Sequence, residues 1–228
     1  VRYSKPLRLN AERYKRIQGL SVDEVDPSGE NLEMVLNNLS EKEKILFSDW
    51  TDEIFGVRFS TISKDGHVSV IVEDSKNHTK ENLVDTGFGY SQILPILLSV
   101  WKVNRSEKVP YGRLRYGYMV RSVCYYEAIE QPELHLHPAL QAKLIDTFAQ
   151  LVATEKTRKI KFIMETHSET MINRLGYLIN KKKLIPELVN VVIFDKEEDG
   201  NTKVTQVNFN EKGQLEKWPI GFFDPDEA

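Results

Sequence analysis

The sequence has little of several features that mark common protein classes. It contains a single cysteine, Cys124, so no disulfide can form within the chain. No signal-peptide pattern is found, and this absence and the lone cysteine together favour a reducing cytoplasm. No apolar run reaches the roughly 18 residues of a membrane span. The longest, residues 93–101, contains Pro95. Disulfide-stabilised and membrane-spanning classes are therefore disfavoured.

An excess of charge of either sign is also missing. Lys and Arg number 31 against 34 Asp and Glu, a net charge of −3, and hydrophobic residues make up 40% of the chain. This is the composition of an ordinary globular protein, with no global reason to expect nucleic acid. A basic stretch with Arg113, Arg115 and Arg121 reads as a solvated loop, although a nucleic-acid or partner contact stays open. The chain starts at Val1, and we expect an upstream portion.

The hydrophobic pattern predicts an α/β fold with a largely parallel sheet flanked by helices, because strands and helices alternate. Residues 93–101 are apolar nearly all round, which predicts a buried helix. Pro95 fits a helix best in its first turn, so we expect this helix to begin near Ser91. The other expected elements are helices at 32–39, at 41–55, after Pro138 and from Met171; a hairpin over 57–72 around Asp65-Gly66; strands at 123–129, 160–164 and 189–194; and a strand at 204–209 that pairs back onto the last of these.

Polar side chains follow two of the predicted strands. Glu130 ends one strand and His167 follows another, and ligands bind at the carboxyl ends of strands in open α/β sheets. A carboxylate there can hold Mg²⁺ through water, and a histidine can donate a hydrogen bond to phosphate. The glycine-rich turn at residues 85–92 leads into a helix, whose first amides form a natural anion site. All three elements suit phosphate or its metal.

These segments together resemble a known family. Residues 87–92 (GFGYSQ) resemble a divergent ABC signature motif. Residues 129–138 (IEQPELHLHP) look like a Walker B strand end that runs into a D-loop, and residues 164–168 (METHS) look like a switch-histidine loop. Their order and spacing are similar to those of ABC-type ATPases related to OLD, RecF and SMC proteins. The opening Pro6-Leu7-Arg8 and the tail at 213–224 resemble an uncharacterised bacterial subgroup of these ATPases.

The resemblance implies an ATP and Mg²⁺ site shared by two modules. Glu130 would hold Mg²⁺ through water, His167 would be the switch histidine, and His137 would lie in the D-loop at the dimer seam. The nucleotide, held by the Walker A loop of the other module, would be contacted in trans by Gly87, Gly89, Ser91 and Gln92.

Two departures from the family pattern affect hydrolysis. Gln131 stands where the catalytic glutamate usually is, and glutamine cannot accept a proton from the attacking water. Either Glu133 takes over this role or hydrolysis is slow. In addition, the sequence contains no phosphate-binding loop of the form G-x-x-x-x-G-K-[ST]. We expect that loop on an upstream portion or on another chain.

Some of these residues, and an acidic cluster near the end of the chain, allow other interpretations. His135 and His137 could form a metal site, although no third ligand is near in sequence. His137, which precedes Pro138, could simply cap the following helix. An acidic cluster could be a nuclease metal site like that of TOPRIM domains. A hairpin turn is preferred, because only about thirty residues follow the cluster. The cluster consists of Asp195, Glu197, Glu198 and Asp199.

The sequence therefore predicts three regions and leaves two main functions open. Residues 1–80 would form a connecting region with helices and a β-hairpin. Residues 81–190 would carry the signature, Walker B and switch motifs, and residues 191–228 would form a hairpin and tail. The chain would belong to an ATPase that dimerises around ATP to drive a partner, in DNA maintenance or anti-phage defence. The alternative is a nucleotide-gated assembly module with little or no hydrolysis, and a nuclease is the weakest option. Expected partners are a second copy or a Walker A-bearing portion, with an effector protein or nucleic acid left open.

Overall fold

The computed structural model describes residues 1–6, 8, 12–17, 22–105, 124–154, 159–197 and 200–216. The chain divides into two compact units, here called unit 1 (Val1–Lys143 with Glu155–His167) and unit 2 (Leu144–Thr154 with Ser168–Ala228). The three regions expected from the sequence remain a prediction. The basic stretch with Arg113, Arg115 and Arg121 lies outside the described residues, as does the tail from residue 217.

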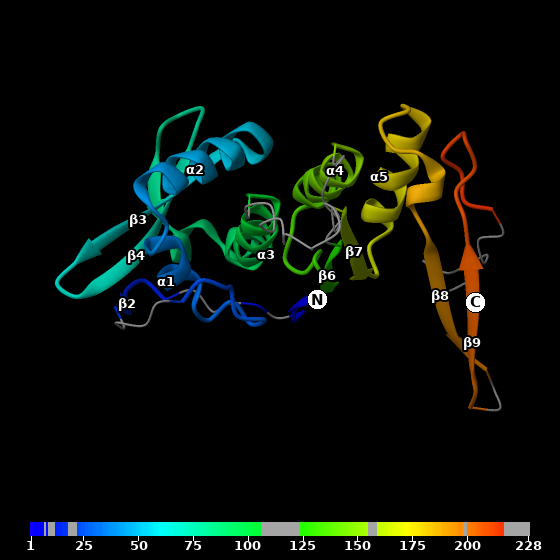
Figure 1. The fold of residues 1–228 in the computed structure, drawn as a ribbon, viewed down its shortest axis with the longest axis horizontal. Helices are drawn as coiled ribbons and strands as arrows, with labels where there is room; N and C mark the ends of the chain where they lie inside the picture. Colours follow the sequence, from blue (N-terminus) through cyan, green and yellow to red (C-terminus); the bar gives the residue numbers. More distant parts are fainter. Residues whose placement is uncertain are drawn as a thin grey trace, which may run out of the picture. The chain divides into compact units, whose positions relative to one another are not determined.

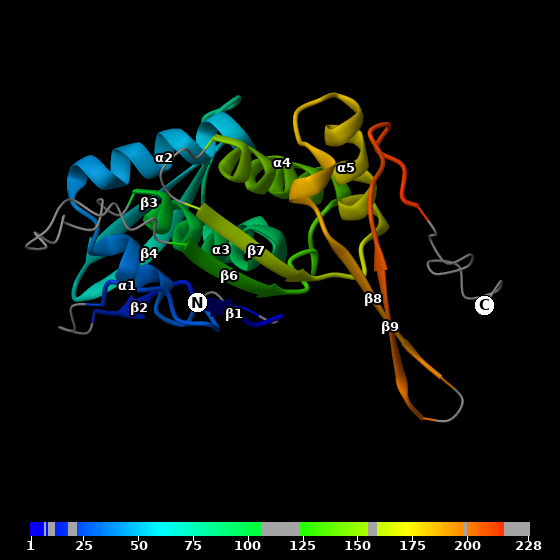
Figure 2. The ribbon, with the colours of Figure 1, turned by 45° about the vertical axis from the view of Figure 1, so that its right-hand side comes forward.

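Unit 1 contains a three-stranded parallel sheet (Figure 2). Strand β6 (Cys124–Glu130) lies between β1 (Arg2–Ser4) and β7 (Lys159–Glu165), and both neighbours run parallel to it. The helix α4 (Pro138–Thr154) follows β6 in the chain and precedes β7, as in a parallel crossover. The predicted α/β fold with a parallel sheet and flanking helices is confirmed. Strand β1 was not predicted.

The long helix α3 (Phe88–Arg105) starts three residues earlier than predicted. The prediction of a start near Ser91 is wrong, and so is the placement of Pro95 in the first turn. Pro95 lies inside the helix, where it removes one main-chain hydrogen bond. Burial explains why the helix tolerates this loss: every residue from 91 to 101 is buried, so packing outweighs local preference.

An antiparallel sheet forms the second layer of unit 1. Its strands are β2 (Lys15–Arg16), β3 (Val57–Lys64), β4 (His67–Asp74) and β5 (Lys80–Asn82), and β4 pairs with the other three. The predicted hairpin is confirmed: Asp65 and Gly66 form its two-residue turn, with φ angles of 51° and 75°. Such a turn needs residues that tolerate positive φ, which explains the Asp-Gly pair.

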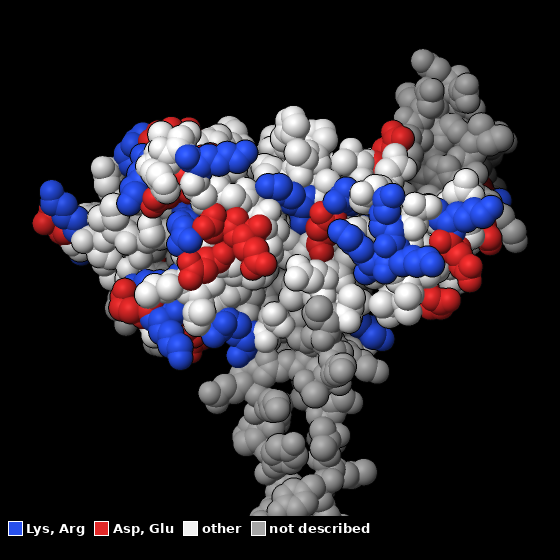
Figure 3. All heavy atoms as spheres, turned by 90° about the horizontal axis from the view of Figure 1, so that it is seen from above, with Lys and Arg blue, Asp and Glu red and all other residues white. Residues whose placement is uncertain are grey.

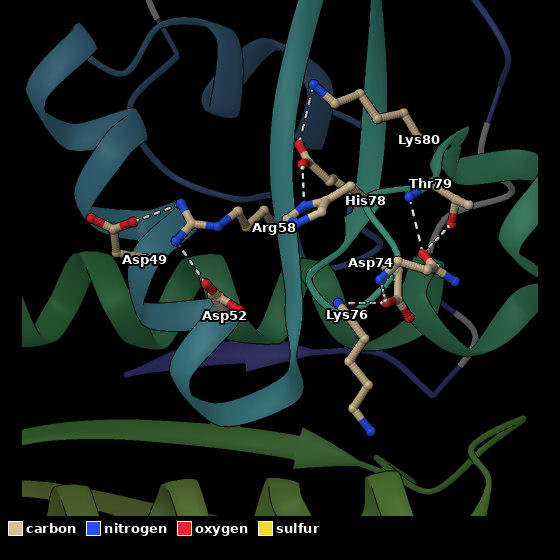
Figure 4. Close-up of polar contacts among 10 residues, drawn as sticks. Asp49, Asp52, Arg58, Asp74, Lys76, His78, Thr79 and Lys80 are labelled. Carbon is tan, nitrogen blue, oxygen red and sulfur yellow. Dashed lines mark hydrogen bonds and ion pairs between the residues drawn. The ribbon is translucent and has the colours of Figure 1, made fainter.

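Helices α1 (Leu32–Asn37) and α2 (Glu41–Phe55) and the short helix η1 (Leu83–Thr86) complete unit 1, and the first two lie close to their predicted ranges. Figure 1 shows α2 along the β3–β4 hairpin. Phe47 of α2 packs against Phe59 of β3 and Trp101 of α3, with ring centroids 6.4 and 5.2 Å apart. Arg58 of β3 reaches back to Asp49 and Asp52 of α2 at 2.8 and 2.6 Å (Figure 4).

Unit 2 contains α5 (Glu169–Asn180), the short helix η2 (Pro186–Leu188) and an antiparallel hairpin of β8 (Val191–Lys196) and β9 (Thr202–Val207). The hairpin agrees with the predicted pairing. Ser168 caps α5 by accepting a hydrogen bond from the Met171 amide at 3.2 Å. Two glycines let the chain after β9 lie against α5, since a Cβ on Gly176 would come within 2.4 Å of the Gly213 carbonyl oxygen.

Across the ranges that the structure describes, no helix combines the length and apolar character needed to cross a membrane.

Candidate functional site

Two glutamates lie next to each other where β6 and β7 end. Glu130 and Glu165 are register partners in the parallel ladder, so their main chains are adjacent at the carboxyl edge of the sheet. The Tyr3 hydroxyl, on β1, donates a 2.6 Å hydrogen bond to Oε1 of Glu130. That hydrogen bond raises the pKa of Tyr3 above its ordinary value, with smaller contributions from desolvation and from the charges of Glu130 and Glu165. The edge is thus acidic.

The chain turns sharply directly after β6. Gln131 has a φ of 41°, which non-glycine residues rarely adopt, and its amide donates to the Glu165 carbonyl at 2.8 Å. His135, four residues on, also has a positive φ, of 60°. Such conformations cost on the order of 1–3 kcal/mol and persist where the surroundings hold them, often at functional sites. We name residues 130–137 the acidic turn.

Glu133 links the acidic turn to the residues after β7. Its Oε1 accepts a 2.7 Å hydrogen bond from the main-chain amide of His167. Its Oε2 is buried and has no hydrogen-bond partner in the part of the chain that the structure describes. The His167 residue itself is exposed. Glu133 therefore fixes the position of His167 through the backbone and leaves the imidazole accessible.

The start of α3 lies against the acidic turn. Phe88, the first helical residue, is 62% exposed, and its ring centroid is 5.5 Å from that of His135. A Cβ placed on Gly89 would lie 3.4 Å from the His135 carbonyl oxygen, so a side chain there would crowd the turn. Gly87 precedes the helix with a φ of 81°, which suits glycine. We name residues 87–90 the signature turn; the first amides of a helix have no partners within the helix.

The side chains of Ser91 and Gln92 point into the fold rather than into this edge. Both residues are buried, at 3% and 2% exposed. The Ser91 hydroxyl donates to the Phe88 carbonyl of its own helix at 2.7 Å. Gln92 accepts a hydrogen bond from the amide of Arg8 at 3.0 Å and donates one to its carbonyl at 2.8 Å. The predicted nucleotide contacts of these two residues remain predictions, and the structure gives both a role in packing.

Arg8, from the opening Pro6-Leu7-Arg8, lies at this site although its position in the sequence does not predict it. It is 3% exposed, and its guanidinium donates to the carbonyls of Glu130 and Gln131 at 3.0 and 3.3 Å. Burial lowers the pKa of Arg8 to about 10, although the charge of Glu133 acts in the opposite direction. A single arginine in a polar stretch gives no periodic signal, so only the fold shows that it stands behind the acidic turn.

His137 caps α4. Its Nδ1 accepts a 3.2 Å hydrogen bond from the Ala139 amide, which confirms the helix-cap interpretation. Among the described residues, no group of three or more His, Cys, Asp or Glu side chains could hold a metal ion. The structure thus gives no support to a site on His135 and His137. For the nuclease interpretation, Asp195 and Glu197 are described, whereas residues 198 and 199 lie outside the described ranges.

Charges of both signs share the face drawn in Figure 3. Lys and Arg side chains lie among Asp and Glu side chains there. This mixture agrees with the small net charge of −3. A nucleic-acid partner therefore remains a prediction without support from this face.

An acidic edge on a parallel sheet, beside a glycine-led helix start, defines an α/β domain suited to bind phosphate groups and their metal. The family described as AAA ATPase domain matches residues 8–172, well over half of the chain. The chain belongs to this AAA ATPase family.

Solved structures show more distant similarity. One comes from work on ATP-driven dimerization and DNA-stimulated activation of SMC ATPases; it shares 13% identity at a TM-score of 0.46, over 72% of this chain and 85% of that one. A second is the Smc head domain with an extended coiled coil, bound to the C-terminal domain of ScpA, from Pyrococcus furiosus; it shares 13% identity at a TM-score of 0.44, over 78% of this chain and 40% of that one. A third is an Smc head bound to the C-winged helix domain of ScpA; it shares 13% identity at a TM-score of 0.47, over 79% of this chain and 46% of that one. No curated protein matches the sequence significantly.

Proposed function

We propose that this chain supplies one half of an ATP site in an ABC-type module that dimerises around Mg-ATP. The observation that carries the proposal is the contact between the signature turn and the acidic turn, where Phe88 meets His135 and Gly89 approaches the His135 carbonyl. One turn offers main-chain amides to phosphate and the other offers carboxylates to a cation. A bound nucleotide with its metal needs both kinds of group.

The residues at the acidic edge fit Mg²⁺. Glu130 is half-buried at the end of β6, and the Tyr3 hydroxyl donates to its Oε1. A carboxylate oxygen of Glu130 can accept a hydrogen bond from a water on the metal, which is how Mg²⁺ commonly contacts protein when phosphates supply part of its shell. Bound Mg²⁺ would neutralise phosphate charge. Glu165, beside Glu130 in the ladder, adds a second oxygen donor.

His167 is suited to contact phosphate. The hydrogen bond from its amide to Glu133 fixes the backbone, and the residue is exposed. An imidazole in this position can donate a hydrogen bond to a γ-phosphate oxygen. In this proposal Glu130 acts on the metal side of the nucleotide and His167 acts on the phosphate side.

Calorimetric titration with Mg-ATP tests the proposal. The 228-residue chain has no phosphate-binding loop in its sequence, so we predict weak binding to the chain alone. We predict strong binding to the full-length protein that carries the expected Walker A portion. A Glu130→Ala variant of that protein should lose the Mg²⁺ dependence of binding. Micromolar affinity of the isolated chain for Mg-ATP would contradict the assignment of the site.

A specific observation favours a second candidate, the assembly module with little hydrolysis. Gln131 follows Glu130 directly, and its amide side chain can orient a water but cannot take its proton. We predict that Gln131→Glu raises ATP turnover of the full-length protein and shortens the lifetime of its ATP-bound dimer. Phosphate release and size-exclusion chromatography measure the two quantities. Unchanged turnover would mean that Gln131 does not limit hydrolysis.

A further inference from the structure

Arg8 reaches two segments that are far apart in sequence. Its guanidinium Nη1 donates to the carbonyls of Lys5 at 2.6 Å and Glu130 at 3.0 Å, and its Nη2 donates to the carbonyl of Gln131 at 3.3 Å. On the other side, its Nε donates to the carbonyl of Gln92 at 2.8 Å. One side chain therefore holds both the end of β6 and the beginning of α3.

The side chain of Gln92 makes hydrogen bonds to the main chain of Arg8. Its Oε1 accepts from the Arg8 amide at 3.0 Å and its Nε2 donates to the Arg8 carbonyl at 2.8 Å, so three hydrogen bonds join the two residues. Both are buried, with 3% and 2% of their surface exposed. Because neither residue can move without breaking several buried hydrogen bonds, the start of α3 and the end of β6 are mechanically joined.

The electrostatics of Arg8 are unusual for a residue that only packs. All the hydrogen-bond acceptors found for its guanidinium in the described chain are neutral carbonyls, although the charge of Glu133 acts on it from nearby. Burying a charge without a directly bonded counter-charge is costly. Its pKa of about 10 still leaves Arg8 protonated at neutral pH. The positive charge thus stays fixed directly behind Glu130 and Gln131.

We propose that Arg8 is a positioning residue that couples the signature turn to the acidic turn, so that both occupy their nucleotide-binding geometry together. This inference rests on the proposed function. In the dimer, the signature turn would bind phosphate held by the partner, while the acidic turn acts on the metal and water. A guanidinium can bridge several carbonyls in fixed directions, whereas a lysine ammonium is a compact point charge and cannot span the same set.

The test compares two steps of nucleotide use in the full-length protein. We expect Arg8→Lys to leave the affinity of the monomer for Mg-ATP within about threefold, because the phosphate-binding loop dominates that affinity. ATP-dependent dimerisation should weaken by at least about tenfold, the effect of losing one charge-assisted hydrogen bond. The matched control is Arg58→Lys, which removes the guanidinium that bridges Asp49 and Asp52 in the same unit (Figure 4). It should change neither the affinity of the monomer for Mg-ATP nor the ATP-dependent dimerisation.

A second variant keeps the inference testable if Arg8→Lys does not fold. Gln92→Met keeps a similar volume and the main-chain contact to Nε of Arg8, and removes the two side-chain hydrogen bonds. We expect it to fold and to weaken dimerisation by at least about threefold, the effect of one neutral hydrogen bond.

Normal dimerisation of a folded Arg8→Lys or Gln92→Met protein would overturn the coupling. Equal losses of monomer affinity and dimerisation would also overturn it, because they would indicate a purely structural role. If the wild-type protein neither binds Mg-ATP nor dimerises, the proposed function itself fails, and the coupling fails with it.

Discussion

The signature turn and the acidic turn lie against each other, yet they expose different parts of the chain. At the signature turn, the exposed residues are Gly87 and Phe88, while the side chains of Ser91 and Gln92, directly after the turn, are buried. Apart from the Phe88 ring, what this turn can offer a ligand is main-chain amide. At the acidic turn, Glu130 is partly accessible, and beyond it His167 is exposed. What that edge offers is side-chain oxygen and imidazole.

This difference indicates a division of labour between the two turns. Amides at a helix start attract anions, and carboxylates attract cations, so adjacent turns of opposite character suit a nucleotide and its metal together. It also indicates how each turn should respond to mutation. Side-chain changes at 91 should act mainly on stability, and changes at 92 on both stability and dimerisation. Changes at 131 and 133 should act mainly on chemistry.

The largest effect on stability is expected from Gln92→Met. The change leaves the buried amide and carbonyl of Arg8 without the partners they have in the wild type. We predict a loss of about 2–3 kcal/mol in the free energy of unfolding, the cost of unpaired buried groups, measured by urea denaturation of the 228-residue chain. Ser91→Ala, which removes one bond within its own helix, should cost about 1 kcal/mol or less. Equal losses would contradict the distinction between the two positions.

At the acidic turn, Glu133→Ala should lower ATP turnover of the full-length protein by at least about tenfold, against about a hundredfold or more for a typical general base. Such a loss has two explanations: Glu133 acts as the base, or Glu133 positions His167, since its carboxylate accepts a hydrogen bond from the amide of His167. Glu133→Gln keeps an acceptor for that amide and cannot act as a base. We predict that Glu133→Gln keeps most of the turnover that Glu133→Ala loses. If Glu133→Gln is as inactive as Glu133→Ala, Glu133 is the working base.

A similarly small effect is expected at His137. His137→Ala removes the acceptor for the Ala139 amide and should lower the free energy of unfolding by about 1 kcal/mol. His137→Asn should restore most of this loss, since asparagine is a preferred capping residue. Thermal unfolding of the two variants measures the difference. A D-loop role would be recognised by a dimerisation defect that Asn does not restore, and that result would show that capping is only part of its function.

Elements with a strong local signal were predictable from the sequence. Helix α2 follows the range predicted from its mixed charged and apolar pattern, and the Asp65-Gly66 pair marks the hairpin between β3 and β4. The start of α3 was missed because Pro95 suggested a first turn, whereas burial holds the proline inside the helix. Strand β1 was missed because three residues carry no periodic pattern, and it exists by pairing with β6.

The candidate site was predictable as a set of motifs but not as a set of contacts. Glu130 could be placed at a strand end because a predicted strand precedes it, and the structure puts it there. The inward direction of Gln92 and the position of Arg8 could not be inferred, because the two residues are 84 positions apart and meet only in the folded chain. The same applies to the hydrogen bond from His167 to Glu133.

Phe88 provides the most direct test that the signature turn receives phosphate from a partner. Phe88 is exposed at the first position of α3, where a negative charge favours the helix but would repel a phosphate. ATP-dependent dimerisation of the full-length protein should be measured by size-exclusion chromatography with light scattering for wild type, Phe88→Glu and Phe88→Gln. We predict that Phe88→Glu abolishes the ATP-dependent dimer without lowering the monomer's unfolding temperature, and that Phe88→Gln still dimerises. Dimerisation of Phe88→Glu at the wild-type ATP concentration would contradict the proposal that the start of α3 faces the nucleotide.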